Sequence, residues 1–277
     1  MAWTVGDIIS NVEELAPREL AASWDNVGLQ VGSRDWPVKK VWVALDPLPQ
    51  VVKAACRAKV DLLITHHPLI FKPLKSIDCM TSAGDIIHSA LRHHVAIFSA
   101  HTNLDSAAGG VNDSLAQRIG LCNLEVLQKG EHGSAALGEK EQLVVQGLGR
   151  TGDLPRETTL ALLANELKKS LGIESVCIAG DPDLAVSKVA LCSGSGASLL
   201  GDFLASSAQV YVSGDLRYHD ARDVETAGRG LIDIGHFASE HLIVEVLAGK
   251  LTDMLNRSNA DVSIEACRLE QDPLKRI

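Results

Sequence analysis

The sequence predicts an α/β protein with duplicated βαβ-type units and mixed sheets. Short apolar, β-branched runs alternate with helical patterns of about 10–15 residues, as βαβ units require. Each half of the chain also repeats one order of parts, in which strands and helices alternate and two of the strands end in polar clusters. Residue identity between the halves is low, so the duplication is inferred from the pattern.

Each expected strand is a short apolar run that ends abruptly in a polar or glycine-containing cluster. The expected strands are Val41–Ala44, Asp61–Thr65, Val95–Ser99, Val189–Cys192, Gln209–Ser213 and Leu231–Ile234. The helical patterns between and around them predict helices at Val5–Leu15, Gln50–Lys59, Gly84–His93, Val111–Ile119, Thr158–Leu171, Ala197–Ala205, His219–Ala227 and Ala238–Asn256. The segment Gln128–Asp153 is rich in Gly, Glu and Lys, and we expect the domain junction there, with a short strand at Gln142–Gln146.

Composition and charge narrow the class of protein. Hydrophobic residues make up 46% of the 277 residues and charged residues 22%, as in ordinary globular proteins. Acidic residues interrupt the first twenty positions, which therefore do not fit a secretion signal. Charges also break every apolar segment well below the roughly 18 residues that a membrane span needs. We therefore expect a cytoplasmic protein with no membrane association.

The cysteines argue against a cysteine-based metal or redox motif, and the net charge argues against general nucleic-acid binding. The six cysteines are scattered and form no C-x-x-C pair, so we expect reduced thiols rather than a zinc or redox motif. The formal net charge of −9 argues against a general nucleic-acid binder, although a local basic patch stays open.

Histidines and carboxylates follow the expected strands at their carboxyl ends, where ligands bind in open α/β sheets. These residues are His66, His67, His101, Asp105, His236 and Glu240. Three separate strands thus deliver candidate ligands to one kind of location. The sequence therefore favours a metal site over a set of unrelated surface residues.

Each cluster alone also has a simpler interpretation. His66 and His67 can converge only if the strand ends before them, which Pro68 favours, and the alternative is a surface turn that contains two imidazoles. The pairs His101/Asp105 and His236/Glu240 have i,i+4 spacing, which places both side chains on one helical face but is also common in plain surface pairs.

The donor types predict the metal chemistry. Imidazole and carboxylate suit Zn, Fe, Mn or Co, and the clusters contain no thiolate. Five or six candidate ligands exceed the three protein ligands of a typical catalytic zinc, and a carboxylate can bridge. We therefore expect two divalent metal ions per chain, about 3.5–4 Å apart.

Three further features have open alternatives. The loop Ser193–Gly196 could bind an anion through its backbone N–H groups, but a tight structural turn is favoured. Lys72 and Lys75 could hold a phosphate-bearing substrate, although exposed lysines usually bind nothing specific. Asp215 could lie near the site without being a ligand, or could cap a helix.

Five segments together resemble the interacting-factor-three-like family, also labelled GTP cyclohydrolase I type 2 or dinuclear metal centre protein. They are SWDNVGLQVG at 23–32, LLITHHPLIFKPL at 62–74, SAHTNLD at 99–105, SGDLRYHDA at 213–221 and DIGHFASE at 233–240. The resemblance spans nearly the whole chain in the family's motif order. Longer members carry an extra middle domain, which Gln128–Asp153 is too short to contain.

The resemblance implies two interlinked α/β domains, namely residues 1–127 with 235–277, which would bind the metals, and residues 128–234. It implies a ring-forming homo-oligomer, commonly a hexamer built as a trimer of dimers. The family's metal ligands fall on His66, His67, Asp105, His236 and Glu240. His101 matches a family histidine that lies near these ligands and could shuttle a proton.

The function expected from the residues and the resemblance is that of a dinuclear metal-dependent hydrolase. The family name implies ring opening of GTP with formate release, and hence a nucleotide substrate. Nothing in the sequence identifies guanine recognition. The alternative is a non-catalytic metal-binding protein for storage, delivery or regulation. A ring around nucleic acid ranks last because the chain is acidic.

Overall fold

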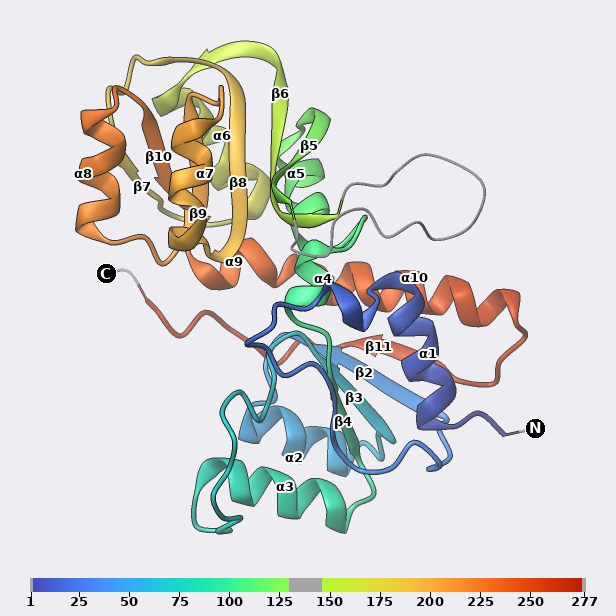
Figure 1. Cartoon of the computed structure of the whole chain (residues 1–277). Helices are drawn as coiled ribbons and strands as arrows, with labels where there is room; N and C mark the ends of the chain where they lie inside the picture. Colours follow the sequence, from blue (N-terminus) through green and yellow to red (C-terminus); the bar gives the residue numbers. More distant parts are fainter. Residues whose placement is uncertain (1, 130–145, 276–277) are drawn as a thin grey trace. The chain divides into compact units, whose positions relative to one another are not determined.

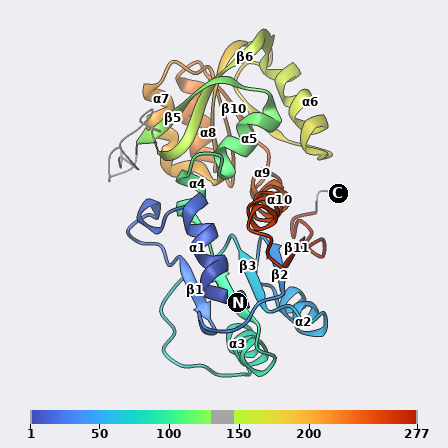
Figure 2. The ribbon, with the colours of Figure 1, turned by 90° about the vertical axis from the view of Figure 1, so that its right-hand side faces the viewer.

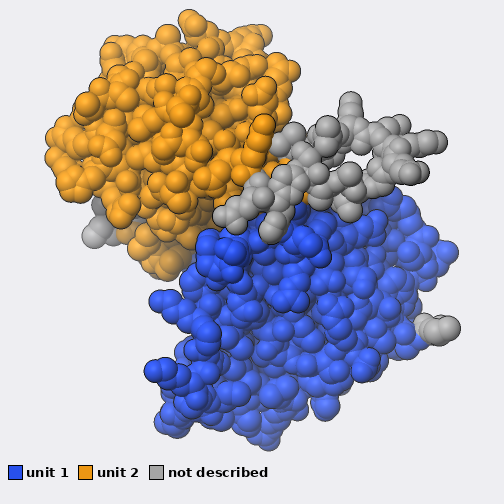
Figure 3. Space-filling model, viewed as in Figure 1, with its two compact units in different colours: residues 1–104, 243–271 blue, residues 105–242, 272–277 orange. Residues whose placement is uncertain are grey.

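The computed structural model describes residues 2–129 and 146–275. It divides the chain into two compact units, which Figure 3 colours separately. Unit 1 contains residues 1–104 and 243–271, and unit 2 contains residues 105–242 and 272–277. The expected boundaries lay at 127/128 and 234/235, and that domain assignment stays a prediction. Residues 142–145 of the strand expected at Gln142–Gln146 lie outside the described residues.

Unit 1 is built on a five-stranded mixed sheet with the order β1-β4-β3-β2-β11. Figure 1 labels its strands β2, β3, β4 and β11. The strands are β1 (Gly28–Val31), β2 (Lys40–Ala44), β3 (Leu62–Thr65), β4 (Ala96–Ser99) and β11 (Ser263–Ala266). Only β1 runs antiparallel to its neighbour. The three expected strands in this unit are confirmed. The two edge strands, β1 and β11, were not expected because polar residues interrupt their short apolar pattern.

Helices cover both faces of this sheet. They are α1 (Val5–Leu15), α2 (Pro49–Arg57), α3 (Ser82–Arg92) and α10 (Leu242–Arg257). The helices α2 and α3 pack against Leu63 and Ile97. Leu62 and Ile64 point the other way along β3 and are equally buried. Figures 1 and 2 show α1 and α10 on that side of the sheet.

Unit 2 contains a six-stranded mixed sheet with the order β5-β6-β8-β9-β10-β7. The strands are β5 (Cys122–Lys129), β6 (Gly147–Thr159), β7 (Cys177–Ala179), β8 (Ala185–Ser195), β9 (Val210–Gly214) and β10 (Gly230–Asp233). The central strands β8, β9 and β10 are parallel, and the outer strands pair antiparallel. Strand β6 was not expected from the sequence, because it contains Gly, Arg, Asp and Pro, which interrupt any apolar periodicity.

Two pairs of helices enclose the unit 2 sheet. The helices α5 (Val111–Ile119) and α6 (Leu160–Leu171) pack on the face that contains Val189 and Val212. The helices α7 (Leu200–Ala205) and α8 (Tyr218–Thr226) cover the other face, where Phe203 stacks on the fully buried Tyr211 at 5.1 Å between ring centroids. Two short helices, α4 (Thr102–Ser106) and α9 (His236–Glu240), follow β4 and β10.

Several expected helix boundaries were wrong. The helix expected from Thr158 begins at Leu160, because Thr158 and Thr159 belong to β6 and Thr159 caps the helix by accepting a bond from the Leu162 N–H. The segment expected as one helix from Ala238 contains two, α9 and α10, and no Pro or Gly marks the break between them. The expected helix at Ala197–Ala205 begins as a 3-10 turn, Gly196–Leu199.

The internal correspondence between the halves is confirmed at the level of fold. Each sheet has three central parallel strands that are consecutive neighbours, β2-β3-β4 in unit 1 and β8-β9-β10 in unit 2. The third strand of each set leads into a short helix, α4 or α9. No helix in the described part of the chain is long and apolar enough to cross a membrane.

Candidate metal centre

Three histidines of unit 1 converge at the carboxyl ends of β3 and β4. One ring nitrogen from each of His66, His67 and His101 can be chosen such that all three lie within 4.8 Å of one another. The ring centroids of His66 and His67 are 5.1 Å apart, and those of His66 and His101 are 5.2 Å apart. The expected convergence of His66 and His67 is therefore present.

The end of β3 explains how adjacent histidines turn to the same side. Regular strand structure stops at Thr65, and the next two carbonyl groups leave the ladder. The Ser99 hydroxyl donates to the His66 carbonyl and the Thr65 hydroxyl to the His67 carbonyl, both at 2.8 Å. These bonds satisfy polar groups that burial would otherwise leave unpaired.

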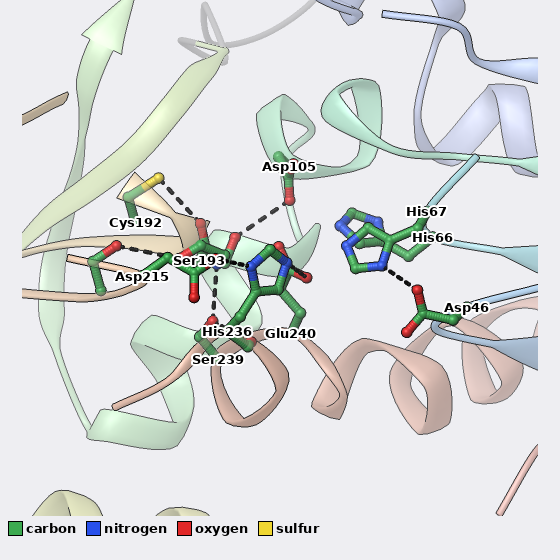
Figure 4. Close-up of polar contacts among 12 residues, drawn as sticks. Asp46, His66, His67, Asp105, Cys192, Ser193, Asp215, His236, Ser239 and Glu240 are labelled. Carbon is green, nitrogen blue, oxygen red and sulfur yellow. Dashed lines mark hydrogen bonds and ion pairs between the residues drawn. The ribbon is translucent and has the colours of Figure 1, made fainter. Parts of the chain in front are cut away.

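An acceptor holds Nδ1 of each of these histidines. His66 Nδ1 lies 2.9 Å from the Ala100 carbonyl oxygen, which can only accept, so the proton is on Nδ1. His67 Nδ1 lies 2.8 Å from Asp46 Oδ1 (Figure 4), and His101 Nδ1 lies 2.9 Å from Asp25 Oδ1. Such contacts fix the ring and direct the Nε2 lone pair to a metal.

The carboxylates behind the histidines are held in turn. Burial raises the pKa of Asp25, but bonds from His101 and Thr102 outweigh it and lower the pKa to about 2, so this carboxyl stays ionised. The buried carboxylate of Glu270 accepts the backbone N–H groups of Leu45 and Asp46 at 2.8 and 2.7 Å. Glu270 thereby fixes the chain that carries Asp46.

Unit 2 presents a second group of donors. His236 is the first residue of α9, and its Nδ1 lies 2.7 Å from Asp215 Oδ2 (Figure 4). Its Nε2 lies 2.9 Å from Glu240 Oε2, one turn further along α9. Asp105 accepts a bond of 3.3 Å from the Ser193 hydroxyl. The i,i+4 spacing thus brings His236 and Glu240 together on one face, as expected.

The carboxyl end of β8 is shaped around this group. The Gly194 N–H donates to the Ser239 hydroxyl at 2.8 Å. Gly194 has a φ of +62°, and a Cβ atom there would lie 2.1 Å from Glu240 Oε1. The neighbouring Ser193 N–H donates to Asn112. The tight turn expected at Ser193–Gly196 was therefore wrong: residues 193–195 form the irregular end of β8, and Gly196 begins the 3-10 turn. The glycine at position 194 makes room for the Glu240 carboxylate.

The buried thiol of Cys192 lies next to this group. Burial, with added effects of the Asp105 and Glu240 charges, raises the pKa of Cys192 well above its ordinary value. The thiol is therefore protonated at neutral pH without a metal ion, and Cys192 belongs to none of the candidate metal-binding groups among the described residues.

The alternatives left open for Asp215 are also resolved by geometry. The residue before α8 is Arg217, so Asp215 does not cap that helix. It has a φ of +54°, outside regular structure, and contacts His236. Asp215 therefore lies beside the candidate site and orients an imidazole.

Lys72 and Lys75 lie in the exposed segment after β3. Lys75 lines a cavity of about 580 Å³ with Gln30, Leu74 and Ile77, and no candidate metal ligand borders that cavity. Within the part of the chain that the structure describes, neither lysine makes an ion pair. Their expected role in substrate binding stays a prediction.

Asp25, Asp46 and Glu270 are the supporting residues that sequence reasoning missed. Asp46 follows β2 as the histidines follow β3 and β4, so the same search of strand ends would have found it. Asp25 lies in the segment SWDNVGLQVG, which was singled out only as a motif of the family resemblance and not as a source of site residues. Glu270 is more than 220 positions from its partners, and no local pattern indicates it.

The donor set fits divalent transition metals. The imidazoles of His66, His67 and His101, and of His236, are held at Nδ1, and carboxylates accompany them. Hard and intermediate donors of this kind suit Zn, Fe, Mn or Co. The chain therefore has His and carboxylate clusters that can hold metal ions.

Comparison with known proteins places these features in a family. The family model described as Duf34/NIF3 (NGG1p interacting factor 3) matches residues 3–273. A Clostridium perfringens protein named GTP cyclohydrolase 1 type 2 homolog is 34% identical over 273 residues, covering 99% of both chains. A relative of the same name from Lactococcus lactis is 35% identical over 250 residues, covering 89% of this chain and 91% of the relative.

Solved structures agree with the sequence comparison. The structure of a Bacillus cereus protein related to NIF3 has a TM-score of 0.91 at 28% identity and covers 99% of both chains. Staphylococcus aureus protein SA1388 has a TM-score of 0.90 at 29% identity over the full length of both chains. The chain, with its two mixed sheets and paired histidine and carboxylate clusters, belongs to the Duf34/NIF3 family.

Proposed function

We propose that this protein is a dinuclear metal-dependent hydrolase that opens a ring of a GTP-like nucleotide and releases formate. His66, His67, Asp105, His236 and Glu240 would hold two divalent ions. The observation that carries the proposal is the Nδ1 contact of each imidazole with a carbonyl or carboxylate, because such a contact fixes the ring in the orientation in which Nε2 binds a metal.

The number of donors supports two ions rather than one. The histidines of unit 1 and the group formed by His236, Glu240 and Asp105 of unit 2 together exceed the three protein ligands of a typical catalytic zinc. A pair of ions would supply an activated water and stabilise the developing charge. The printed names of the Clostridium perfringens and Lactococcus lactis relatives support GTP as the first substrate to test.

The protein's own side chains have distinct roles in this proposal. The carboxylates of Asp46 and Asp215 orient His67 and His236. His101, which Asp25 holds at Nδ1, could move a proton at Nε2 between the substrate and solvent. Lys72 and Lys75 remain candidates for binding the phosphates. The homohexameric ring and the cytoplasmic location also stay predictions.

The test is formate release from GTP by protein loaded separately with zinc, manganese or iron. Glu240→Ala should abolish metal-dependent release. Glu245→Ala is the matched control, because Glu245 is exposed on α10 and, among the described residues, makes an ion pair with Arg268 alone, at the surface. Loss of release in Glu240→Ala alone supports the proposal. Absence of release by metal-loaded wild-type protein would contradict it and favour non-catalytic metal storage, delivery or regulation.

The phosphate-binding role has its own measurement. Lys72→Ala and Lys75→Ala should each raise KM for GTP while leaving kcat nearly unchanged, since a lysine that contacts the phosphates equally in ground and transition states affects only binding. An unchanged KM in both variants would remove these lysines from the site.

A further inference from the structure

Two exposed aromatic side chains stand beside the histidine cluster of unit 1. Trp24 is 61% exposed and Phe71 is 47% exposed, although aromatic residues make up only 4% of the chain. Large aromatic side chains usually bury their surface in a core or an interface. The location of this pair therefore calls for a physical explanation.

The two rings form a continuous aromatic surface with His101. Trp24 and Phe71 meet edge to face with 5.9 Å between ring centroids. Each ring centroid is 6.3 Å from that of His101, again in an edge-to-face arrangement. These distances lie within the range of attractive aromatic contacts. A planar ring bound to this pair would lie next to an imidazole of the metal-binding cluster.

Hydrogen bonds hold the segment that carries Trp24. The adjacent Asp25 accepts bonds from His101 and from the backbone N–H of Thr102, the latter at 3.0 Å. The Ala22 N–H donates to the Thr102 hydroxyl at 2.9 Å. Trp24 is therefore positioned from both sides by contacts to the chain that carries His101.

Phe71 is held to the same segment. The Asn26 side-chain amide donates to the Ile70 carbonyl, and the Ile70 N–H donates to the Gln30 side-chain oxygen at 2.9 Å. Gln30 in turn donates to the Asn26 carbonyl at 2.8 Å. The residues around Trp24 thus use their polar groups to position the two aromatic side chains, whose own surfaces stay exposed.

We propose that Trp24 and Phe71 form a subsite that binds a planar unsaturated ring of the substrate beside the metal-binding histidines. The inference rests on the proposed function, and it assigns ring recognition to stacking. Every nucleobase has a π face, so such a subsite accepts different bases with similar affinity. Selection of the reacting ring then depends on its position relative to the metal-binding residues.

The test is isothermal titration calorimetry of zinc-loaded full-length protein with GTP, ATP, CTP and tripolyphosphate, which has no ring. The wild type should bind the three nucleotides more tightly than tripolyphosphate. Trp24→Ala and Phe71→Ala should each weaken nucleotide binding about 5- to 150-fold, and leave zinc content and tripolyphosphate binding unchanged. Met80→Ala is the control, because Met80 is 91% exposed in the same segment as Phe71 and has no aromatic surface.

Three outcomes would overturn this proposal. Nucleotides could bind no more tightly than tripolyphosphate, the two alanine variants could bind them as the wild type does, or tripolyphosphate binding could weaken equally. A change in oligomeric state by light scattering without a change in nucleotide affinity would assign the two rings to a subunit contact instead. Ring-dependent binding without formate release would support the subsite and contradict the cyclohydrolase, so the two proposals can fail separately.

Discussion

Replacement of Gly194 by alanine tests whether the carboxyl end of β8 is built around Glu240. A Cβ atom at this position would lie 2.1 Å from Oε1 and 3.0 Å from Cδ of Glu240, and 3.5 Å from Nε2 of His236. Ordinary nonbonded contacts lie near 3.5–4.0 Å, so the carboxylate would have to move by roughly 1 Å or more. The backbone at φ +62° adds a cost of about 1–2 kcal/mol for alanine.

The two effects separate in experiment. Because the nearest atom is the far end of a side chain that can move, the free energy of unfolding of the metal-free protein should fall only by the backbone cost of about 1–2 kcal/mol. Metal affinity should fall further, by roughly 10- to 100-fold, as when a supporting contact of a ligand is lost. Denaturant unfolding measures the first effect, and competition with a chelator of known affinity measures the second.

Gly201→Ala is the matched control. Gly201 lies in α7, within ten residues of Gly194, and a Cβ atom there meets nothing within 4 Å. Alanine should stabilise the helix by about 0.5–1 kcal/mol and leave metal affinity unchanged. If Gly194→Ala binds metal as tightly as Gly201→Ala does, the position of the Glu240 carboxylate does not determine metal affinity, and the reasoning is refuted.

Three further predictions concern the residues that support the donors. Asp46→Ala should weaken metal binding about 10- to 100-fold because His67 loses its Nδ1 acceptor, whereas Asp85→Ala, which removes only an exposed ion pair, should not; equal affinities would contradict this. Asp25→Asn should lower the free energy of unfolding of the metal-free protein, with the full loss reached above about pH 4. The loss should shrink as the pH falls toward 2, because the folded-state pKa of Asp25 is lowered to about 2. A loss that is constant between pH 2 and pH 6 would refute the assignment. Asn112→Ala should lower the free energy of unfolding by at least about 2 kcal/mol, because the buried Asn112 amide bonds to both the Asp105 carbonyl and the Ser193 N–H; a loss below about 0.5 kcal/mol in denaturant unfolding would contradict it.

The parallel strands and their terminal clusters could be predicted because both depend on local pattern. Apolar runs such as Leu62–Thr65 stop where the imidazoles begin, and the carboxyl end of a parallel strand is where ligands collect. Strand β6 could not be predicted, because its burial comes from pairing with β5 and β8 rather than from its own composition.

The support of the candidate site depends on contacts between distant residues. Asp25 binds His101 across 76 positions, and Glu270 reaches the chain at Asp46 across 224. No periodicity connects such pairs, so only the fold reveals that the imidazoles are oriented. The need for a glycine at position 194 likewise becomes clear only when Glu240 is found beside it.

The most direct test is the metal content of the purified protein after reconstitution under reducing conditions, measured by inductively coupled plasma mass spectrometry. We expect two divalent ions per wild-type chain, substantially fewer in Glu240→Ala, and two in the control Glu245→Ala. A wild-type chain that retains no transition metal, or a Glu240→Ala chain that retains two ions, would contradict a dinuclear centre held by these residues.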